Sequence, residues 1–231
     1  MTFNALVNRG LAGLDWTAAP LWLVALATIP SCMFVTFMAF QPWIPPGYLF
    51  DDTLTVASLV SDAGEPCCAW YFGFVSNLGI LLWAGTAAVC ALSALIFHSR
   101  PRGTYRAVFF LYGGALTAWL ALDDLYKMHE KVHWSGIHEA FVFAVYMLLV
   151  LVYLVTFRRL IVESGFVLLF LSFAFFSMSI LVDTLHPGAS AWHHLGDDGS
   201  KFVGISLWTA FHLCAAWIAI DSDMDRRQAL S

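Results

Sequence analysis

Six apolar runs constrain the fold of this chain more than any other feature of its sequence. Each is about as long as the roughly 20 residues that an α-helix needs to cross the hydrocarbon core of a bilayer. The chain is 60% hydrophobic and 12% charged, which is far more apolar than a soluble domain. We therefore expect an all-α fold, a polytopic membrane helical bundle with six transmembrane helices in a single domain, residues 1–231. The predicted spans lie near Leu21–Phe40, Trp70–Phe97, Ala107–Lys127, Glu139–Phe157, Gly165–Asp183 and Lys201–Ile220.

The arginines predict the orientation of this bundle. Basic residues favour cytoplasmic loops, and in a six-span topology every arginine falls on one side. They are Arg9, Arg100, Arg102, Arg106, Arg158, Arg159, Arg226 and Arg227. Both termini are therefore predicted to be cytoplasmic, in a multi-pass protein of the bacterial inner membrane. Residues 1–19 are expected to form an amphipathic segment on the cytoplasmic surface. Residues 41–69 are expected to form an extracytoplasmic loop that can cover the outer face as a lid.

Acids and histidines gather on the predicted outer side of the membrane. Ionisable groups at the ends of membrane helices are costly, and they are functional candidates for that reason. We therefore predict an extracytoplasmic site built from histidines and carboxylates. The candidate metal ligands are His129, His133, Asp183, His186, His193 and His194. The candidate catalytic residues are Asp123, Asp124, Glu130, Ser76 and Asn77.

Two interpretations of the third span's outer end remain open. His129-Glu130-Lys131-Val132-His133 matches H-E-x-x-H, in which two histidines one helical turn apart share a metal and the glutamate is a general base. The same residues also suit a helix end whose polar groups meet water. Asp123 and Lys127 lie one turn apart, so they predict a structural ladder of ion pairs as readily as a site.

Similar alternatives apply to the other candidates. Ser76 and Asn77 either hydrogen-bond a neighbouring helix or point into the same cavity as Asp123. Asp198 and Ser200 resemble the capping residues of a helix start, which predicts that the sixth span begins after them. His193 and His194 favour metal ligation or proton transfer. His212, inside the sixth span, is expected to be a hydrogen-bonded core histidine.

Three short segments together resemble the alkaline ceramidase superfamily of polytopic, zinc-dependent membrane hydrolases. Phe74-Val75-Ser76-Asn77-Leu78 is similar to that family's Ser-Asn-Leu run, and Leu122-Asp123-Asp124-Leu125 resembles its Leu-Asp-Glu-Leu-Pro segment. Ser190-Ala191-Trp192-His193-His194-Leu195 resembles its H-A-W-W-H zinc motif, with Ser190 in the place of the first histidine. The resemblance implies a zinc-dependent hydrolase whose site faces an extracytoplasmic cavity.

The sequence leaves two classes of function open. One is a metal-dependent hydrolase of a lipid amide or ester, with Zn²⁺ as the expected metal and iron or no metal as alternatives. The other is non-catalytic, either an accessory subunit of a larger membrane complex or a protein that handles cations or protons. The expected partners are membrane lipids, with a membrane protein or a second copy of the chain also possible. No basic cluster suggests a nucleic acid.

Overall fold

The protein is described by a computed structural model that covers residues 21–64, 68–100, 103–128, 139–185 and 190–228. All regular secondary structure in these ranges is helical, which confirms the predicted all-α fold. The helices are α2 (Leu21–Phe40), α3 (Pro46–Phe50), α4 (Thr53–Asp62), α5 (Phe74–His98), α6 (Thr104–Tyr126), α8 (Glu139–Thr156), α9 (Arg158–Glu163), α10 (Phe166–Leu185), α11 (Ala191–His194), η2 (Leu195–Gly199) and α12 (Ser200–Gln228).

Among the described residues, five helices are long and apolar enough to cross a membrane. They are Trp22–Phe40, Phe74–His98, Thr104–Tyr126, Phe166–Leu185 and Ala191–Met224. The remaining predicted span coincides with α8, whose apolar part, Phe141–Thr156, is shorter. These long apolar helices support the prediction that the chain is an integral membrane protein.

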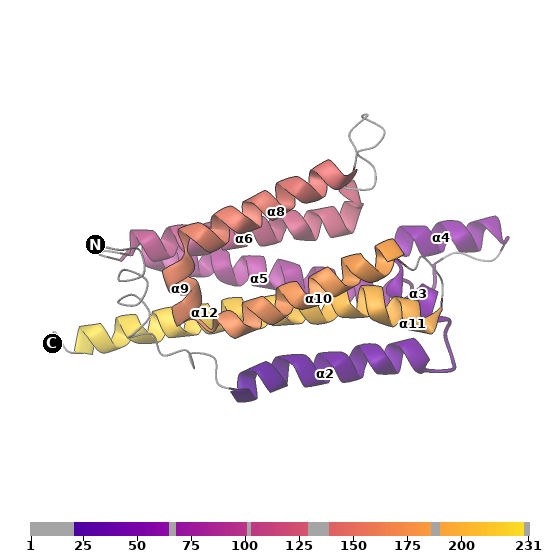
Figure 1. Cartoon of the computed structure of the whole chain (residues 1–231), viewed down its shortest axis with the longest axis horizontal. Coiled ribbons are helices and arrows are strands. Elements are labelled where there is room, and N and C mark those ends of the chain that lie inside the picture. The colour runs from indigo at the N-terminus through magenta and orange to yellow at the C-terminus, as the bar shows by residue number, and fades with distance from the viewer. Residues whose placement is uncertain (1–20, 65–67, 101–102, 129–138, 186–189, 229–231) are drawn as a thin grey trace.

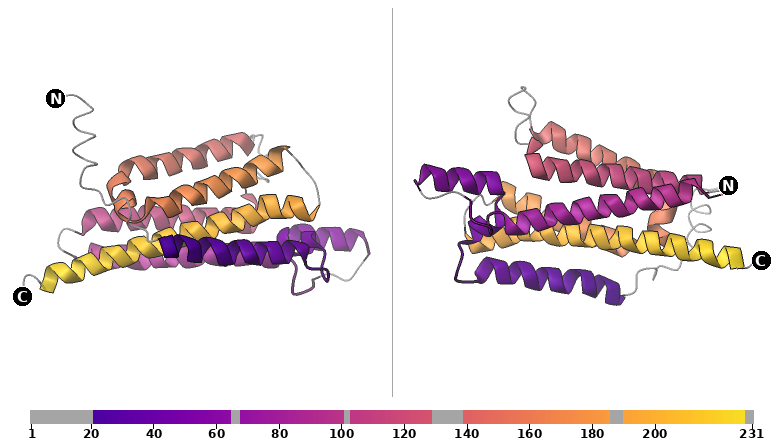
Figure 2. Two further views of the ribbon diagram at one scale, coloured as in Figure 1. Left: turned by 60° about the horizontal axis from the view of Figure 1, so that its bottom comes forward. Right: turned by 180° about the vertical axis from the view of Figure 1, so that it is seen from behind.

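Helix α12 lies at the centre of the bundle. It packs against α5, α10 and α2, while α6 packs against α5 and carries α8 on its other side. The side chains of Trp208 and Phe211 on α12 are almost completely buried at these contacts. Figures 1 and 2 show the result, a bundle in which α8 forms one edge and α2 the other. Helices α3, α4 and α11 gather at one end, opposite the carboxyl end of α12 (Figure 1).

The last membrane helix begins earlier than predicted. Helices α11, η2 and α12 follow one another without a break from Ala191, ten residues before the predicted start at Lys201. Asp198 therefore lies inside the helical run, in the π-helical turn η2, and does not cap a helix start. The capping prediction was wrong because the polar residues that suggested a loop are wound into this wider turn.

We name residues 41–69 the outer segment, after the side of the membrane that the sequence predicts for them, and their described part contains two short helices, α3 and α4. Helix α3 packs against α5, α11 and α2, so it lies across the end of the bundle. Asp52 caps α4 by accepting hydrogen bonds from the backbone N–H groups of Leu54 and Thr55, both at 3.0 Å.

An ion pair ties this outer segment to α6. Helix α6 ends at Tyr126, and Lys127 adopts a left-handed conformation with φ 49°. The Nζ of Lys127 lies 2.7 Å from Asp52 Oδ2. The predicted ladder of Asp123, Lys127 and Glu130 assumed a helix that continues to Glu130, whereas α6 ends at Tyr126 and Glu130 lies outside the described residues. Burial alone would raise the pKa of Asp52, but hydrogen bonds from Lys127 and Thr55 hold it below its ordinary value.

We predict that Asp52→Asn lowers the free energy of unfolding by about 1 to 2 kcal/mol, because it removes the charge but keeps a capping oxygen. A carboxylate with a lowered folded pKa stabilises the fold above its unfolded pKa of about 3.9, and this contribution is lost as the pH falls through the folded value. The difference between the two proteins should therefore narrow in acid. Denaturation in detergent micelles measures it, with Asp62→Asn on the exposed part of α4 as the control. If both variants lost the same free energy of unfolding, the ion pair between Lys127 and Asp52 would not be stabilising the fold.

Candidate functional site

The turn formed by α11 and η2 carries two histidines and two aspartates in register. His193 and His194 end α11, and Asp197 and Asp198 follow four residues later in η2. Side chains four residues apart lie on the same face of a helix. His193 therefore lies on the same face as Asp197, and His194 on the same face as Asp198, and the two faces are adjacent. Single π-helical turns inside α-helices occur frequently at functional sites.

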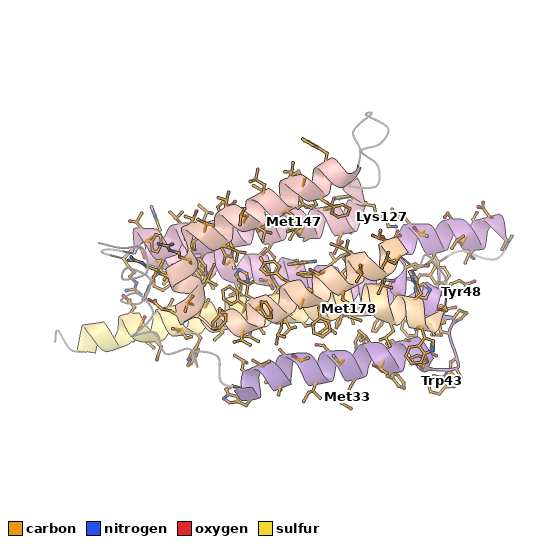
Figure 3. All side chains as sticks on the ribbon, viewed as in Figure 1. Met33, Trp43, Tyr48, Lys127, Met147 and Met178 are labelled. Atoms are coloured by element: carbon orange, nitrogen blue, oxygen red, sulfur yellow. The ribbon has the colours of Figure 1, made fainter. Side chains whose placement is uncertain are left out.

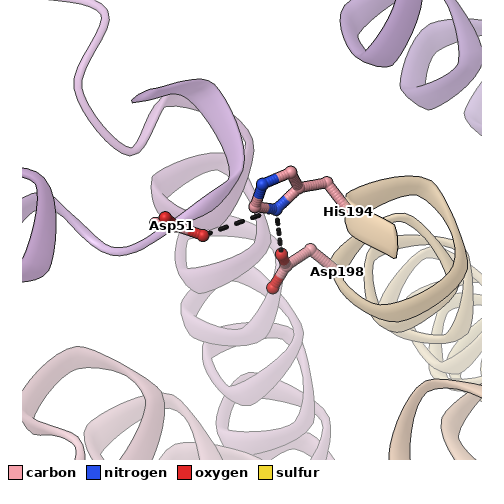
Figure 4. A group of neighbouring side chains, drawn as sticks. All are labelled: Asp51, His194 and Asp198. Atoms are coloured by element: carbon pink, nitrogen blue, oxygen red, sulfur yellow. Dashed lines mark hydrogen bonds and ion pairs between the residues drawn. The ribbon is translucent and has the colours of Figure 1, made fainter. Parts of the chain in front are cut away.

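The first face forms a cluster that we name the inner triad: Asp51, His194 and Asp198 (Figure 4). The Nδ1 atom of His194 lies 3.4 Å from Asp198 Oδ2 and 3.5 Å from Asp51 Oδ1. Each residue offers one ligand atom, and these atoms all lie within 4.8 Å of one another. One imidazole and two carboxylates in this arrangement can hold a divalent metal ion.

Packing holds His194 in place. Its side chain is 6% exposed and stacks on Phe50 at a ring-centroid distance of 6.0 Å. Gly47 lies beside the imidazole, since a Cβ there would be 3.5 Å from Nε2. Burial raises the pKa of Asp51, an effect that the charge of His194 opposes and that of Asp198 adds to. A cation bound among the three side chains would relieve the same electrostatic cost.

A small polar cavity lies next to the inner triad. Its volume is about 30 Å³, and its polar lining consists of Ser76, Asp124, Asp198 and Lys201. The ammonium of Lys201 donates a hydrogen bond to Asp124 Oδ1, and the indole N–H of Trp83 donates one to Asp124 Oδ2 at 3.1 Å. Asp198 belongs to both the cavity and the triad, so the two features are continuous.

The second face carries an outer triad of Asp183, His193 and Asp197. Its three ligand atoms also lie within 4.8 Å of one another, and Asp183 is exposed. The hydroxyl of Ser179 donates a hydrogen bond of 2.7 Å to Asp197. The Nδ1 atom of His193 is buried and has no hydrogen-bond partner among the described residues.

The structure separates the remaining sequence candidates. Asp123 is 5% exposed in α6 and interacts with Tyr146 of α8, whereas Asp124 faces the polar cavity. Asn77 donates a 3.1 Å hydrogen bond to Thr53, so it holds the outer segment. His212 is fully buried and lies 3.0 Å from the carbonyl of Trp208, as expected of a core histidine. His129, Glu130, His133 and His186 lie outside the described residues.

Sequence reasoning missed four residues of this region. Asp197 and Asp198 could have been found, because H-H-x-x-D-D places each histidine four residues before an aspartate. Lys201 is the next charged residue on the same helical run. Asp51 gave no such signal, since it reaches His194 from a segment more than a hundred residues earlier.

The chain was also compared with the models of known protein families, and one of them matches most of its length. Residues 18–215 match the model of a family described as "Domain of unknown function (DUF8692)". The chain belongs to the DUF8692 family. The matched range contains both triads and the polar cavity of this DUF8692 protein. No curated protein and no solved structure matches the chain.

We predict that Lys201→Met lowers the free energy of unfolding by about 2 kcal/mol, because it leaves the largely buried carboxylate of Asp124 without its cation. Adding Asp124→Asn should remove part of this penalty. The double variant should then be less destabilised than the sum of the two single variants by about 1 kcal/mol. Denaturation of all four proteins in the same detergent measures the coupling. Additive effects would show that the two side chains do not stabilise each other.

Proposed function

We propose that this DUF8692 protein is a six-span membrane protein with cytoplasmic termini that binds a divalent metal ion in the inner triad. We further propose that it uses the metal to hydrolyse a lipid amide or ester on the extracytoplasmic side. The observation that carries the proposal is the convergence of Asp51, His194 and Asp198 from two distant parts of the chain. Two carboxylates and one imidazole leave a coordination position for water, as in catalytic zinc sites.

The polar cavity provides room for the reacting water. A cavity needs only about 10–15 Å³ to hold one water molecule, and this one has about 30 Å³. A metal-bound water has a lowered pKa and can attack a carbonyl carbon. Asp124, which lines the cavity, is the proposed general base. The hydroxyl of Ser76 is the proposed hydrogen-bond donor to the developing oxyanion.

The choice of a lipid substrate rests on location and resemblance. The site lies where helices long enough to span a membrane end, so a substrate that reaches it from the bilayer would present a carbonyl near the membrane surface. The similarity of three segments to alkaline ceramidases favours a lipid in which the bond to be hydrolysed is an amide or an ester. Zn²⁺ is the proposed metal because nitrogen and oxygen ligands in a three-residue set suit it.

A second candidate function is a non-catalytic subunit or a protein that handles protons. It is favoured by the pairing of Asp124 with Lys201 and of Asp52 with Lys127, since paired charges of this kind can hold helix ends together. In that case the inner triad would bind protons or a partner rather than a catalytic metal.

Metal content tests the proposed site. Protein purified gently without chelators should contain about one equivalent of a transition metal per protein chain. His194→Ala and Asp198→Asn should lower the metal content measured by inductively coupled plasma mass spectrometry. His98→Ala serves as the control, because His98 is exposed near the opposite end of the bundle. Less than about 0.2 equivalents in the parent protein would contradict a resident metal.

A second measurement separates hydrolysis from metal binding. Ser76→Ala should keep the metal but lower kcat for fluorogenic lipid amides and esters in mixed micelles by about 100-fold, the typical loss when one oxyanion donor is removed. Asn77→Ala, one residue along the same helix and outside the cavity lining, should change kcat little. A metal-loaded parent protein without activity on either substrate class would favour the non-catalytic alternative.

The topology has its own test. Green fluorescent protein fused to the C-terminus should fluoresce, and alkaline phosphatase fused there should be inactive, because six spans put both termini on one side and the arginines place that side in the cytoplasm. Phosphatase fused within residues 41–69 should be active. The opposite pattern would place the triads on the cytoplasmic side and contradict the proposed orientation.

A further inference from the structure

A second cavity, much larger than the polar one, lies on the other face of the α11–η2 turn. Its volume is about 750 Å³, within the range typical of small-molecule sites. The lining comes from α2, α10, the α11–η2 turn and the start of α12. This lining includes Val35, Thr36, Phe175, Met178, Ser190 and His193.

The packing of the helices explains why this cavity exists. Helices α2 and α10 both pack against α12, but they are not a packed pair themselves. The space between them lies along helices that are long enough to span the membrane. At its outer end, Trp192 of α11 makes an edge-on contact with Phe40 of α2 at 4.7 Å. The cavity is thus bordered by two membrane helices, and Trp192, which contacts Phe40, forms part of its lining.

The character of the lining changes along the cavity. Apolar side chains such as Val35, Phe175 and Met178 form most of the wall. Ser190 and His193 form a polar part, and the Nδ1 atom of His193 is buried without a hydrogen-bond partner among the described residues. An apolar wall with one polar end matches a molecule that is itself a hydrocarbon chain with a polar head.

Inside a bilayer, such a cavity has a preferred class of occupant. Lipid tails are as apolar as the side chains of the wall, so a tail enters without a hydrophobic penalty and also without a large hydrophobic gain. Water, in contrast, would find few hydrogen bonds among these side chains. Selective retention of a lipid therefore depends on the polar end, where a buried donor or acceptor without a partner costs free energy.

We propose that this cavity binds one acyl chain of a membrane lipid, with the lipid's polar group hydrogen-bonded at Ser190 and His193. The proposal rests on the membrane placement of the helices and does not require the hydrolysis proposed for the inner triad. It assigns lipid recognition to the face of the α11–η2 turn that carries the outer triad. The polar cavity lies on the other face, beside the inner triad.

Photolabelling tests the proposal. The protein is reconstituted in phosphatidylethanolamine and phosphatidylglycerol vesicles that contain a phospholipid with a diazirine at the end of one chain. A parallel arm uses a free fatty acid with the same diazirine, which distinguishes a membrane lipid from a released chain. Peptide mass spectrometry should find adducts concentrated on lining residues of α2 and α10, such as Thr36 and Met178.

Matched variants make the result specific. Thr36→Trp/Met178→Trp narrows the cavity from both walls and should reduce labelling of the lining at least several-fold. Met33→Trp/Ile180→Trp adds the same bulk outside the lining and should change it little, because both residues are exposed and Met33 lies on the side of α2 away from α10 (Figure 3). His193→Phe keeps an aromatic ring but removes the polar atoms, so it should lower the amount of lipid retained through purification.

Several results would overturn the proposal. Adducts spread evenly over exposed residues such as Phe170 and Leu181 would indicate ordinary surrounding lipid. Equal labelling in the two tryptophan double variants would show that the tail does not enter the cavity. Lining residues cross-linked to a second copy of the chain would identify a protein as the occupant. Metal content is unaffected by these outcomes, so failure here is distinguishable from failure of the proposed function.

Discussion

The need to compensate charge at the end of a membrane bundle determines much of this structure. A carboxylate carried out of water is tolerated only when a cation or hydrogen-bond donors accompany it. Asp124 has Lys201 and Trp83, and Asp52 has Lys127 and its own helix N-terminus. In the inner triad, two carboxylates share a single imidazole, and Lys127 and Lys201 act on Asp51 and Asp198 without a direct ion pair to either. The proposed metal ion would complete the compensation of this negative charge.

The α11–η2 turn presents two different surfaces, and the inner triad lies on one of them. Because it is continuous with α12, its side chains are held on a rigid element rather than on a loop. One face meets α3 and the polar cavity, and the other meets the apolar space between α2 and α10. A lipid bound on the outer face and a metal on the inner face would lie on opposite sides of the same turn. The two proposed sites would thus be held by one turn and yet remain separate.

The fold was largely predictable from the sequence, and the site was predictable only in part. Apolar runs of membrane-spanning length define the helices, and the end of α2 at Phe40 was predicted to the residue. The start of the last membrane helix was missed because Asp197, Asp198 and Gly199 favour a loop by composition, whereas the structure winds them into a π-helical turn. Composition reports local preference, and packing against α10 and α2 overrides it.

Within the site, residues close in sequence were easier to find than residues brought together by folding. His193 and His194 were identified from their own chemistry, and their partners four residues later follow from helical spacing. Asp51 could not be found in this way, because its approach to His194 depends on how α3 crosses the bundle end. Asp123 and Asp124 looked equivalent in the sequence, but consecutive side chains of a helix point in different directions. Asp123 therefore faces α8, and Asp124 faces the polar cavity.

X-ray absorption spectroscopy at the edge of the bound metal tests the central claim most directly. The account predicts a first shell of nitrogen and oxygen atoms at about 2.0–2.2 Å, with the multiple scattering of one imidazole per metal. That imidazole signal should disappear in His194→Ala and persist in His98→Ala. Sulfur in the first shell, or an imidazole signal unchanged in His194→Ala, would show that the metal is not held by Asp51, His194 and Asp198.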